Sequence, residues 1–323
     1  MSGRTGISSQ NRGRKRLWSW RNRVRSFGKL TAVVACAAVF GAPPAFADVT
    51  STELTDTTAD TALPRQSEGQ SAELLSAFFG LDNALPFLSR LICWSAPGKD
   101  GMPVIFSTEI DHATMQAGDF RVTTASGKTG EIQCVTLLPA TDGGELRTVL
   151  LVGEFGNADT DPPVKVEIAG HLRSIDGTMD YRGAQVDVTP LAPGPSLVMA
   201  EVADPAAQDL GLGMGRTDGT DCPSEAVLQA VRVVWAGGVT LENGDEAGDT
   251  QRDLYRVTVQ AADGSSREIT PTALDDLGDG DNNHLLCLDT ADTPISVSFP
   301  AGIFVDPNGD LNPATTIAVF PRP

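Results

Sequence analysis

The chain has 323 residues, of which 24 are basic and 42 acidic, so its net charge is −18 at pH 7. A surface this acidic repels nucleic acid and anionic lipid, and we expect neither as a partner. The length is sufficient for two domains of ordinary size.

The first 47 residues predict an export signal. Their nine charges are all basic, and they precede the apolar run LTAVVACAAVFGAPPAFA at residues 30–47. The run ends in the small-residue pattern Ala45-Phe46-Ala47, so we expect a signal peptide at 1–47, cleaved between Ala47 and Asp48. Because the run is shorter than the roughly 20 residues of a spanning helix, we predict a secreted or periplasmic protein without a transmembrane segment.

An alternative is a lipoprotein anchored through Cys36. The stretch VVAC at residues 33–36 loosely resembles a bacterial lipobox. Only about six apolar residues precede Cys36, fewer than a typical signal core contains, and apolar residues continue beyond it. We therefore favour cleavage after Ala47, which leaves 15 basic and 42 acidic residues in the mature chain.

Two segments precede the first expected strands. Residues 48–70 are rich in Thr, Ser, Asp and Glu and have almost nothing to bury, which predicts a disordered lead. Residues 71–92 have apolar side chains near helical spacing (Leu74, Leu75, Phe78 and Phe79) and predict a short helical segment that packs on a neighbouring domain. A lipid- or partner-binding helix is the alternative, which the scarcity of basic residues disfavours.

From Pro103 onward, short runs of β-branched and apolar residues alternate with turns rich in Gly and Asp, as is typical of an antiparallel sandwich. The run FRVTTASGKTGEI at 120–132 is answered by YRVTVQAADGSSREI at 255–269. The two runs begin 135 residues apart, and a repeat of that length is too long for a solenoid unit. We predict an all-β fold of two tandem sandwiches, at residues 93–195 and 196–323.

The segment IFSTEIDHATMQAGDFRV at 105–122 resembles the opening of bacterial immunoglobulin-like (Ig-like) domains of the extracellular, S-layer type. The closing DPNGDLNPATTI resembles the turn before the last strand of such domains. The residues that carry the first match are Phe106, Ser107, Asp111, Thr114, Met115, Asp119, Phe120 and Val122. The resemblance implies Ig-like sandwiches, which serve mostly as spacers and binding modules.

The four cysteines that remain after cleavage predict disulfides in an exported protein. Cys93 and Cys134 belong to the first sandwich, and Cys222 and Cys287 to the second. Three connectivities are possible, and pairing within each sandwich is the economical one. A zinc site of four cysteines is a poor competitor, because the sequence has no Cys-x-x-Cys spacing.

The sequence contains no Gly-x-Ser-x-Gly, His-Glu-x-x-His or phosphate-binding loop motif. We therefore predict a non-catalytic surface protein that binds a protein or glycan partner or serves a structural role. A secreted hydrolase with its site between the two sandwiches is the alternative, since a triad can assemble from distant residues.

A further alternative is a calcium-dependent structural module. Asp306, Asn308 and Asp310 alternate in the loop DPNGDLN, a spacing at which oxygen ligands can converge on Ca²⁺. The nearby loop around Asp279 and Asp281 could add carboxylates. Ordinary Asp/Asn/Gly turns are the simpler interpretation of both loops. We predict no other cofactor.

Overall fold

The computed structural model describes residues 50–51, 66–67, 70–203, 222, 227–275 and 280–320. All of them belong to one compact unit, Phe46–Pro323. The expected signal peptide, its cleavage site at Ala47 and Asp48, the alternative at Cys36 and most of the expected lead at 48–70 lie outside the described residues.

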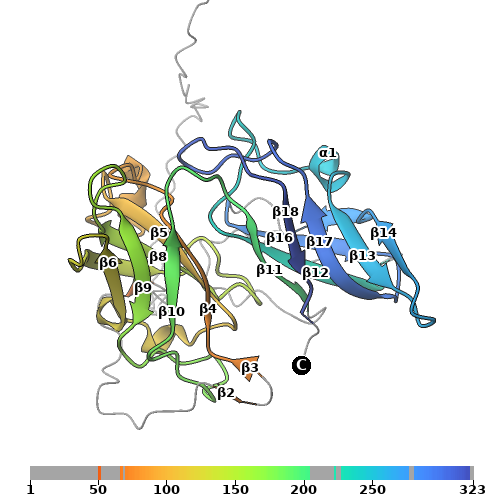
Figure 1. The fold of residues 1–323 in the computed structure, drawn as a ribbon, viewed down its shortest axis with the longest axis horizontal. Coiled ribbons are helices and arrows are strands. Elements are labelled where there is room, and N and C mark those ends of the chain that lie inside the picture. Colours follow the sequence, from red (N-terminus) through yellow and green to blue (C-terminus); the bar gives the residue numbers. More distant parts are fainter. Residues whose placement is uncertain are drawn as a thin grey trace, which may run out of the picture. The chain divides into compact units, whose positions relative to one another are not determined.

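Strands dominate the described residues, which confirms the predicted all-β class (Figure 1). The helices of this part of the chain are short: the single turn α1 (Asp249–Arg252) and the 3₁₀ turns η1 (Phe87–Leu91), η2 (His112–Thr114) and η3 (Ala117–Asp119).

The first set of strands forms an eight-stranded sheet with the order β1-β7-β8-β5-β4-β10-β9-β6. Its members are β1 (Thr50–Ser51), β4 (Leu74–Phe78), β5 (Asp100–Phe106), β6 (Phe120–Thr124), β7 (Glu131–Thr136), β8 (Thr148–Glu154), β9 (Pro163–Ile168) and β10 (Gln185–Thr189). The short strands β2 (Gln66–Ser67) and β3 (Gln70–Ser71) pair separately. Alternate residues of β5 and β9, such as Val104 and Val166, lie in one buried cluster although these strands are not neighbours. The sheet therefore folds over its own core.

The second set forms two four-stranded sheets, β11-β12-β16-β15 and β14-β13-β17-β18. Its members are β11 (Leu197–Val202), β12 (Gln229–Trp235), β13 (Arg256–Gln260), β14 (Ser266–Ile269), β15 (Ala273–Asp275), β16 (Asn283–Leu288), β17 (Thr293–Phe299) and β18 (Thr315–Ala318). Both sheets contribute to a second buried cluster centred on Trp235, Tyr255, Phe299 and Phe304.

The second set repeats the strand pairing of the first. In the first set β4 pairs with β5, β5 with β8, β8 with β7, β6 with β9, and β9 with β10. In the second set β11 pairs with β12, β12 with β16, β16 with β15, β13 with β17, and β17 with β18. The echoed runs at 120 and 255 thus open strands β6 and β13, which occupy equivalent positions.

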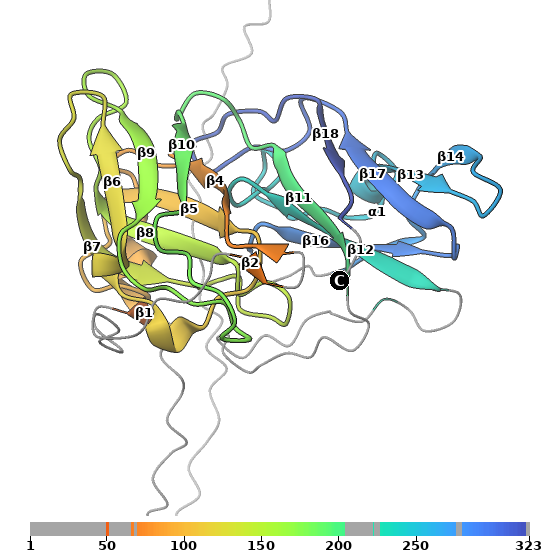
Figure 2. The same cartoon turned by 60° about the horizontal axis from the view of Figure 1, so that its bottom comes forward.

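The irregularities of the two sets also coincide. The β6–β9 register shifts after Thr123, and the β13–β17 register shifts after Thr258, at the same step of the echoed run. In the first set β10 runs parallel to β4 (Figure 2), and in the second a parallel bridge joins Phe320 to Glu201 at the corresponding place. Bulges depend on local sequence and packing, so their recurrence reflects a common backbone plan.

The predicted helix over residues 71–92 is wrong for its first half, which is strand β4. This strand lies between β5 and β10 and is buried almost throughout. Because both of its faces are buried, its sequence lacks the alternation of apolar and polar residues that identifies a strand with one exposed face. Strand β4 thus belongs to the first sheet although it precedes the expected start of the first sandwich at residue 93, and β1, inside the expected disordered lead, pairs with β7 of the same sheet. The helical content of the second half is the 3₁₀ turn η1.

Both predicted cysteine pairings are confirmed: Cys93 is bonded to Cys134, and Cys222 to Cys287. Cys134 lies in β7 and Cys287 in β16. Their partners lie in the long connections that follow β4 and β11, so each disulfide ties the connection between the first two strands of a set to its sheet.

Candidate functional site

The most conspicuous surface feature is a group of large apolar side chains at the tip of the β4–β5 connection. Phe87, Leu88, Leu91 and Trp94 are 66%, 70%, 68% and 83% exposed. Three of them lie within the 3₁₀ turn η1, and Trp94 follows it. We call these four residues together with Arg90 the apolar knob.

The base of the connection is buried, which fixes the knob in place. Leu81, Leu85, Cys93 and Ala96 pack with Cys134 and Val152 in a small cluster of their own. Backbone hydrogen bonds from Leu85 to Lys99 and from Gly98 to Leu85 close the connection, and the Cys93–Cys134 disulfide anchors it to β7. The knob is therefore presented by a stapled loop rather than by a free one.

Arg90 supplies the charge of the knob. Its guanidinium lies 4.7 Å from the ring centroid of Phe87 and 5.2 Å from that of Trp94, and both contacts are cation–π interactions. Residues 83–98 contain no acidic side chain and no other basic one. The hydroxyl of Ser89 donates to the carbonyl of Pro86, and that of Ser95 contacts the sulfur of Cys93. The polar side chains beside the knob are thus engaged within the loop.

A mostly apolar cavity of about 180 Å³ lies behind the connection, between the outer side of β5 and β8 and three loops of the second set. Its walls include Leu85, Pro103, Leu138, Leu150 and Gly237, and the titratable side chain among them is Asp281. Asp281 accepts hydrogen bonds from the backbone and side-chain amides of Asn283. The predicted hydrolase alternative placed its site between the sandwiches, and this cavity offers it one carboxylate and no general acid–base pair among the described residues.

Two ion pairs join the two sets of strands, and the first of them is buried. Arg232 on β12 donates to the Glu145 carboxylate at 2.7 Å and to the Gly143 carbonyl at 2.9 Å. Gly144 has a φ of +92°, and a Cβ there would lie 3.0 Å from the guanidinium of Arg232. Glycine thus permits both the turn and the close approach of the arginine.

A second ion pair runs in the opposite direction: Arg147 of the first set donates to Glu201 of the second at 2.7 Å. Apolar contact among Ile105, Met199 and Val234 accompanies both pairs. The two sets are therefore held together by charge-assisted hydrogen bonds as well as by packing.

His171 is part of a buried polar cluster in the first set. Its Nδ1 lies 2.5 Å from the Asp180 carboxylate, and its Nε2 accepts a hydrogen bond from Arg182 at 2.8 Å. Burial raises the pKa of the neighbouring Asp119 to about 6, and the charge of Asp180 adds to this effect. Both ring nitrogens of His171 are engaged with charged side chains and neither faces a serine or cysteine nucleophile in the hydrogen bonds described, so the cluster resembles a structural network more than a triad.

The other two histidines lie elsewhere. A 2.7 Å hydrogen bond joins Nδ1 of His284 and the Tyr255 hydroxyl. The oxygen of that hydroxyl also accepts a hydrogen bond from the indole N–H of Trp235. Burial lowers the pKa of His284 to about 4, so this ring is neutral at pH 7. His112 begins the 3₁₀ turn η2 and is partly exposed.

The predicted calcium ligands lie in one turn. The backbone amide of Asp310 donates to the Asp306 carboxylate, and the side-chain amide of Asn308 donates to Asp310. The second oxygen of Asp306 is buried without a hydrogen-bond partner, and burial raises the pKa of this residue. Asp281 lies on the cavity wall, and Asp279 is outside the described residues. The turn thus brings Asp306 and Asp310 together through hydrogen bonds that leave one oxygen of Asp306 without a partner.

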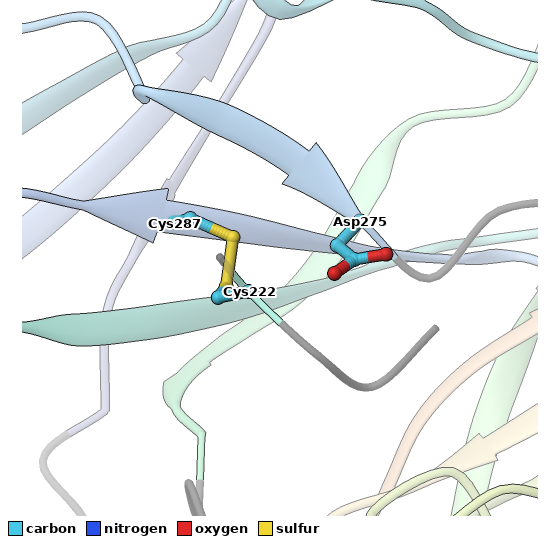
Figure 3. A group of neighbouring side chains, drawn as sticks. All are labelled: Cys222, Asp275 and Cys287. Atoms are coloured by element: carbon cyan, nitrogen blue, oxygen red, sulfur yellow. A yellow bond between two sulfur atoms is a disulfide. The ribbon is translucent and has the colours of Figure 1, made fainter. Parts of the chain in front are cut away.

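In the described part of the chain, the side chains close enough to share one metal ion are Cys222, Asp275 and Cys287 (Figure 3). The two sulfur atoms are joined to each other in a disulfide. A disulfide offers no thiolate, so this group is not a zinc site of the kind that cysteine ligands form.

The sequence predicts a packing helix over residues 71–92, with a lipid- or partner-binding helix as the alternative, and it does not single out the knob because the knob's apolar residues continue the apolar run of β4. A usable signal is present in the sequence: residues 83–98 combine four large apolar side chains with a lone arginine and no carboxylate in an acidic chain. None of the helices in the described part of the chain combines the length and apolarity needed to span a bilayer. Comparison with protein-family models and with curated protein sequences gives no match.

Proposed function

We propose that the protein is an exported, non-catalytic binding module built from two Ig-like sandwiches. The equivalent strand pairing of the two sets supports a duplicated sandwich. The resemblance of residues 105–122 to extracellular Ig-like domains supports the family of that sandwich. The two disulfides are compatible with an extracellular or periplasmic location, since such bonds persist in oxidising compartments.

The observation that carries the binding role is the apolar knob. Single exposed apolar side chains are common on protein surfaces, whereas four large ones side by side usually mark an interaction site. Here a disulfide and a buried base hold them outward. A rigid anchor lowers the entropy lost when such a group binds, which favours the loop as a contact surface.

The ion pairs between the two sets fit this role. Arg232 and Arg147 bond carboxylates of the opposite set, so the second sandwich supports the first and the knob is presented in a fixed direction. An arrangement of this kind suits a module that places a contact surface at a defined distance from its point of attachment.

The proposal is tested with a knob variant in which Phe87, Leu88, Leu91 and Trp94 are all replaced by alanine. The expected result is loss of binding to washed cell envelopes of the producing organism, without a fall in melting temperature, because exposed side chains contribute little to stability. The matched control replaces Ile175, Leu311 and Phe320, which are also exposed apolar residues but lie outside the knob. Equal envelope binding by wild type, knob variant and control would contradict the proposal.

A further inference from the structure

The shape of the knob restricts what it can bind. Each of its four apolar side chains exposes about two thirds or more of its surface, so the knob protrudes and is not recessed. A protruding apolar group must enter either a preformed groove or a surface that deforms around it. The layer formed by lipid headgroups and the upper acyl chains is deformable, and Trp, Phe and Leu side chains partition into it.

The polar groups of the knob argue against a glycan ligand. Sugar recognition needs side-chain hydrogen-bond partners around an open aromatic face. Here Arg90 covers one face of both Phe87 and Trp94, and Ser89 and Ser95 are engaged within the loop. Leu88 and Leu91 add apolar surface but no hydrogen-bonding group.

The charges of the knob agree with a lipid surface. The whole chain carries −18, yet residues 83–98 contain one cation and no acidic side chain. The nearest charged residues toward β5 are Lys99, which is paired with Glu154, and the buried Asp100. Toward β4 the nearest is Asp82, whose carboxylate accepts hydrogen bonds from the side chain of Asn157 and the backbone amide of Ala158. No carboxylate within residues 83–98 would therefore be desolvated when the tip enters a membrane, and the guanidinium of Arg90 is suited to a phosphate oxygen.

We propose that the apolar knob inserts into the headgroup region of a zwitterionic phospholipid bilayer, with Arg90 at the level of the phosphates. This inference rests on the proposed binding role and names the chemistry of its partner. A neutral lipid surface is required because the acidic remainder of the chain is repelled by anionic lipid. The contact is peripheral and reversible.

The test uses vesicles of phosphatidylcholine and the exported protein, with the emission of Trp94 as the signal. The sequence contains four tryptophans. Trp235 is fully buried and gives a constant background emission. Trp18 and Trp20 are replaced by phenylalanine in every variant, so that chains with an uncleaved leader add no tryptophan emission. We expect addition of vesicles to shift the emission to shorter wavelength and lipids brominated near the headgroup to quench it.

Leu88→Ala and Leu91→Ala keep Trp94 as a reporter. Each should weaken partition into the vesicles roughly tenfold, since a large apolar side chain contributes at least that factor when it is buried. The control variants at Ile175 and Leu311 should bind as wild type does. High salt should change phosphatidylcholine binding little, and vesicles rich in anionic lipid should bind less well at low salt.

Several results would overturn the inference. They are an unchanged spectrum at millimolar lipid, a shift that the leucine variants do not weaken, or a shift that appears with protein concentration alone, which indicates self-association. If phosphatidylcholine vesicles fail but binding to washed envelopes still depends on the knob, a protein groove is the partner and the proposed binding role stands. If neither binding depends on the knob, both proposals fall.

Discussion

Replacing Arg232 by methionine should destabilise the protein more than any surface substitution. The side chains of Arg232 and Glu145 are 2% and 0% exposed. The change removes the 2.7 Å bond to Glu145 and the 2.9 Å bond to the Gly143 carbonyl, and leaves the carboxylate with the amide of Asp142 as a donor. An unpaired buried charge of this kind costs about 3–5 kcal/mol of unfolding free energy.

The double variant Arg232→Met/Glu145→Leu separates the value of the pair from the cost of breaking it. Glu145→Leu removes the carboxylate that Arg232→Met leaves unpaired, so the double variant should be more stable than the single one. Urea unfolding at pH 7 can be followed through the emission of Trp235, which is buried in the same strand as Arg232.

The matched control is Arg121→Met, which breaks an exposed pair with Glu167 at 3.3 Å. This pair is solvated and should contribute less than about 1 kcal/mol. The reasoning is refuted if Arg232→Met costs no more than Arg121→Met, or if the double variant is as unstable as the single one.

Three further predictions concern pH, the first disulfide and calcium. Folding raises the pKa of Asp119 from 3.8 to about 6, so the stability that this group contributes is lost as pH rises from 3.8 to 6. Folding lowers the pKa of His284 from 6.5 to about 4, so the stability that this group contributes is lost as pH falls from 6.5 to 4. Each contribution is about 3 kcal/mol. Asp119→Asn should therefore lose more stability than wild type between pH 6.5 and 4 in thermal melts, and parallel pH profiles would contradict this. Replacing Cys93 and Cys134 by serine removes a constraint over 41 residues, which should cost about 4 kcal/mol and speed hydrogen exchange in the knob; unchanged exchange there would show that packing alone holds the loop. If Asp306, Asn308 and Asp310 bind calcium as their spacing predicts, Ca²⁺ should raise the melting temperature of wild type but not of Asp310→Asn, and equal insensitivity of both proteins would identify the loop as a solvated turn.

Local sequence determined the features that depend on short-range pattern. Alternation of apolar and polar residues predicted the strands, and the echo of residues 120–132 at 255–269 placed β6 and β13 at equivalent positions. The distribution of cysteines over the two copies predicted both disulfides. These predictions succeeded because a strand with one buried face carries its two-residue period in the sequence itself.

The tertiary structure decided the features that depend on neighbours. Leu74–Phe78 looks helical in isolation and is a strand because β5 and β10 pair with its two edges, and its side chains are buried on both faces of the sheet. Arg232 and Glu145 are 87 residues apart and meet across the two sets of strands. The pKa of Asp119 is raised by burial that no short pattern encodes.

The knob illustrates the same division within one segment. The sequence determined that residues 71–94 are strongly apolar, but burial is a property of what packs on a side chain and not of the side chain alone. The fold buries Leu74, Phe78 and Phe79 and leaves Phe87 and Trp94 exposed, because the stapled connection turns its tip away from both cores.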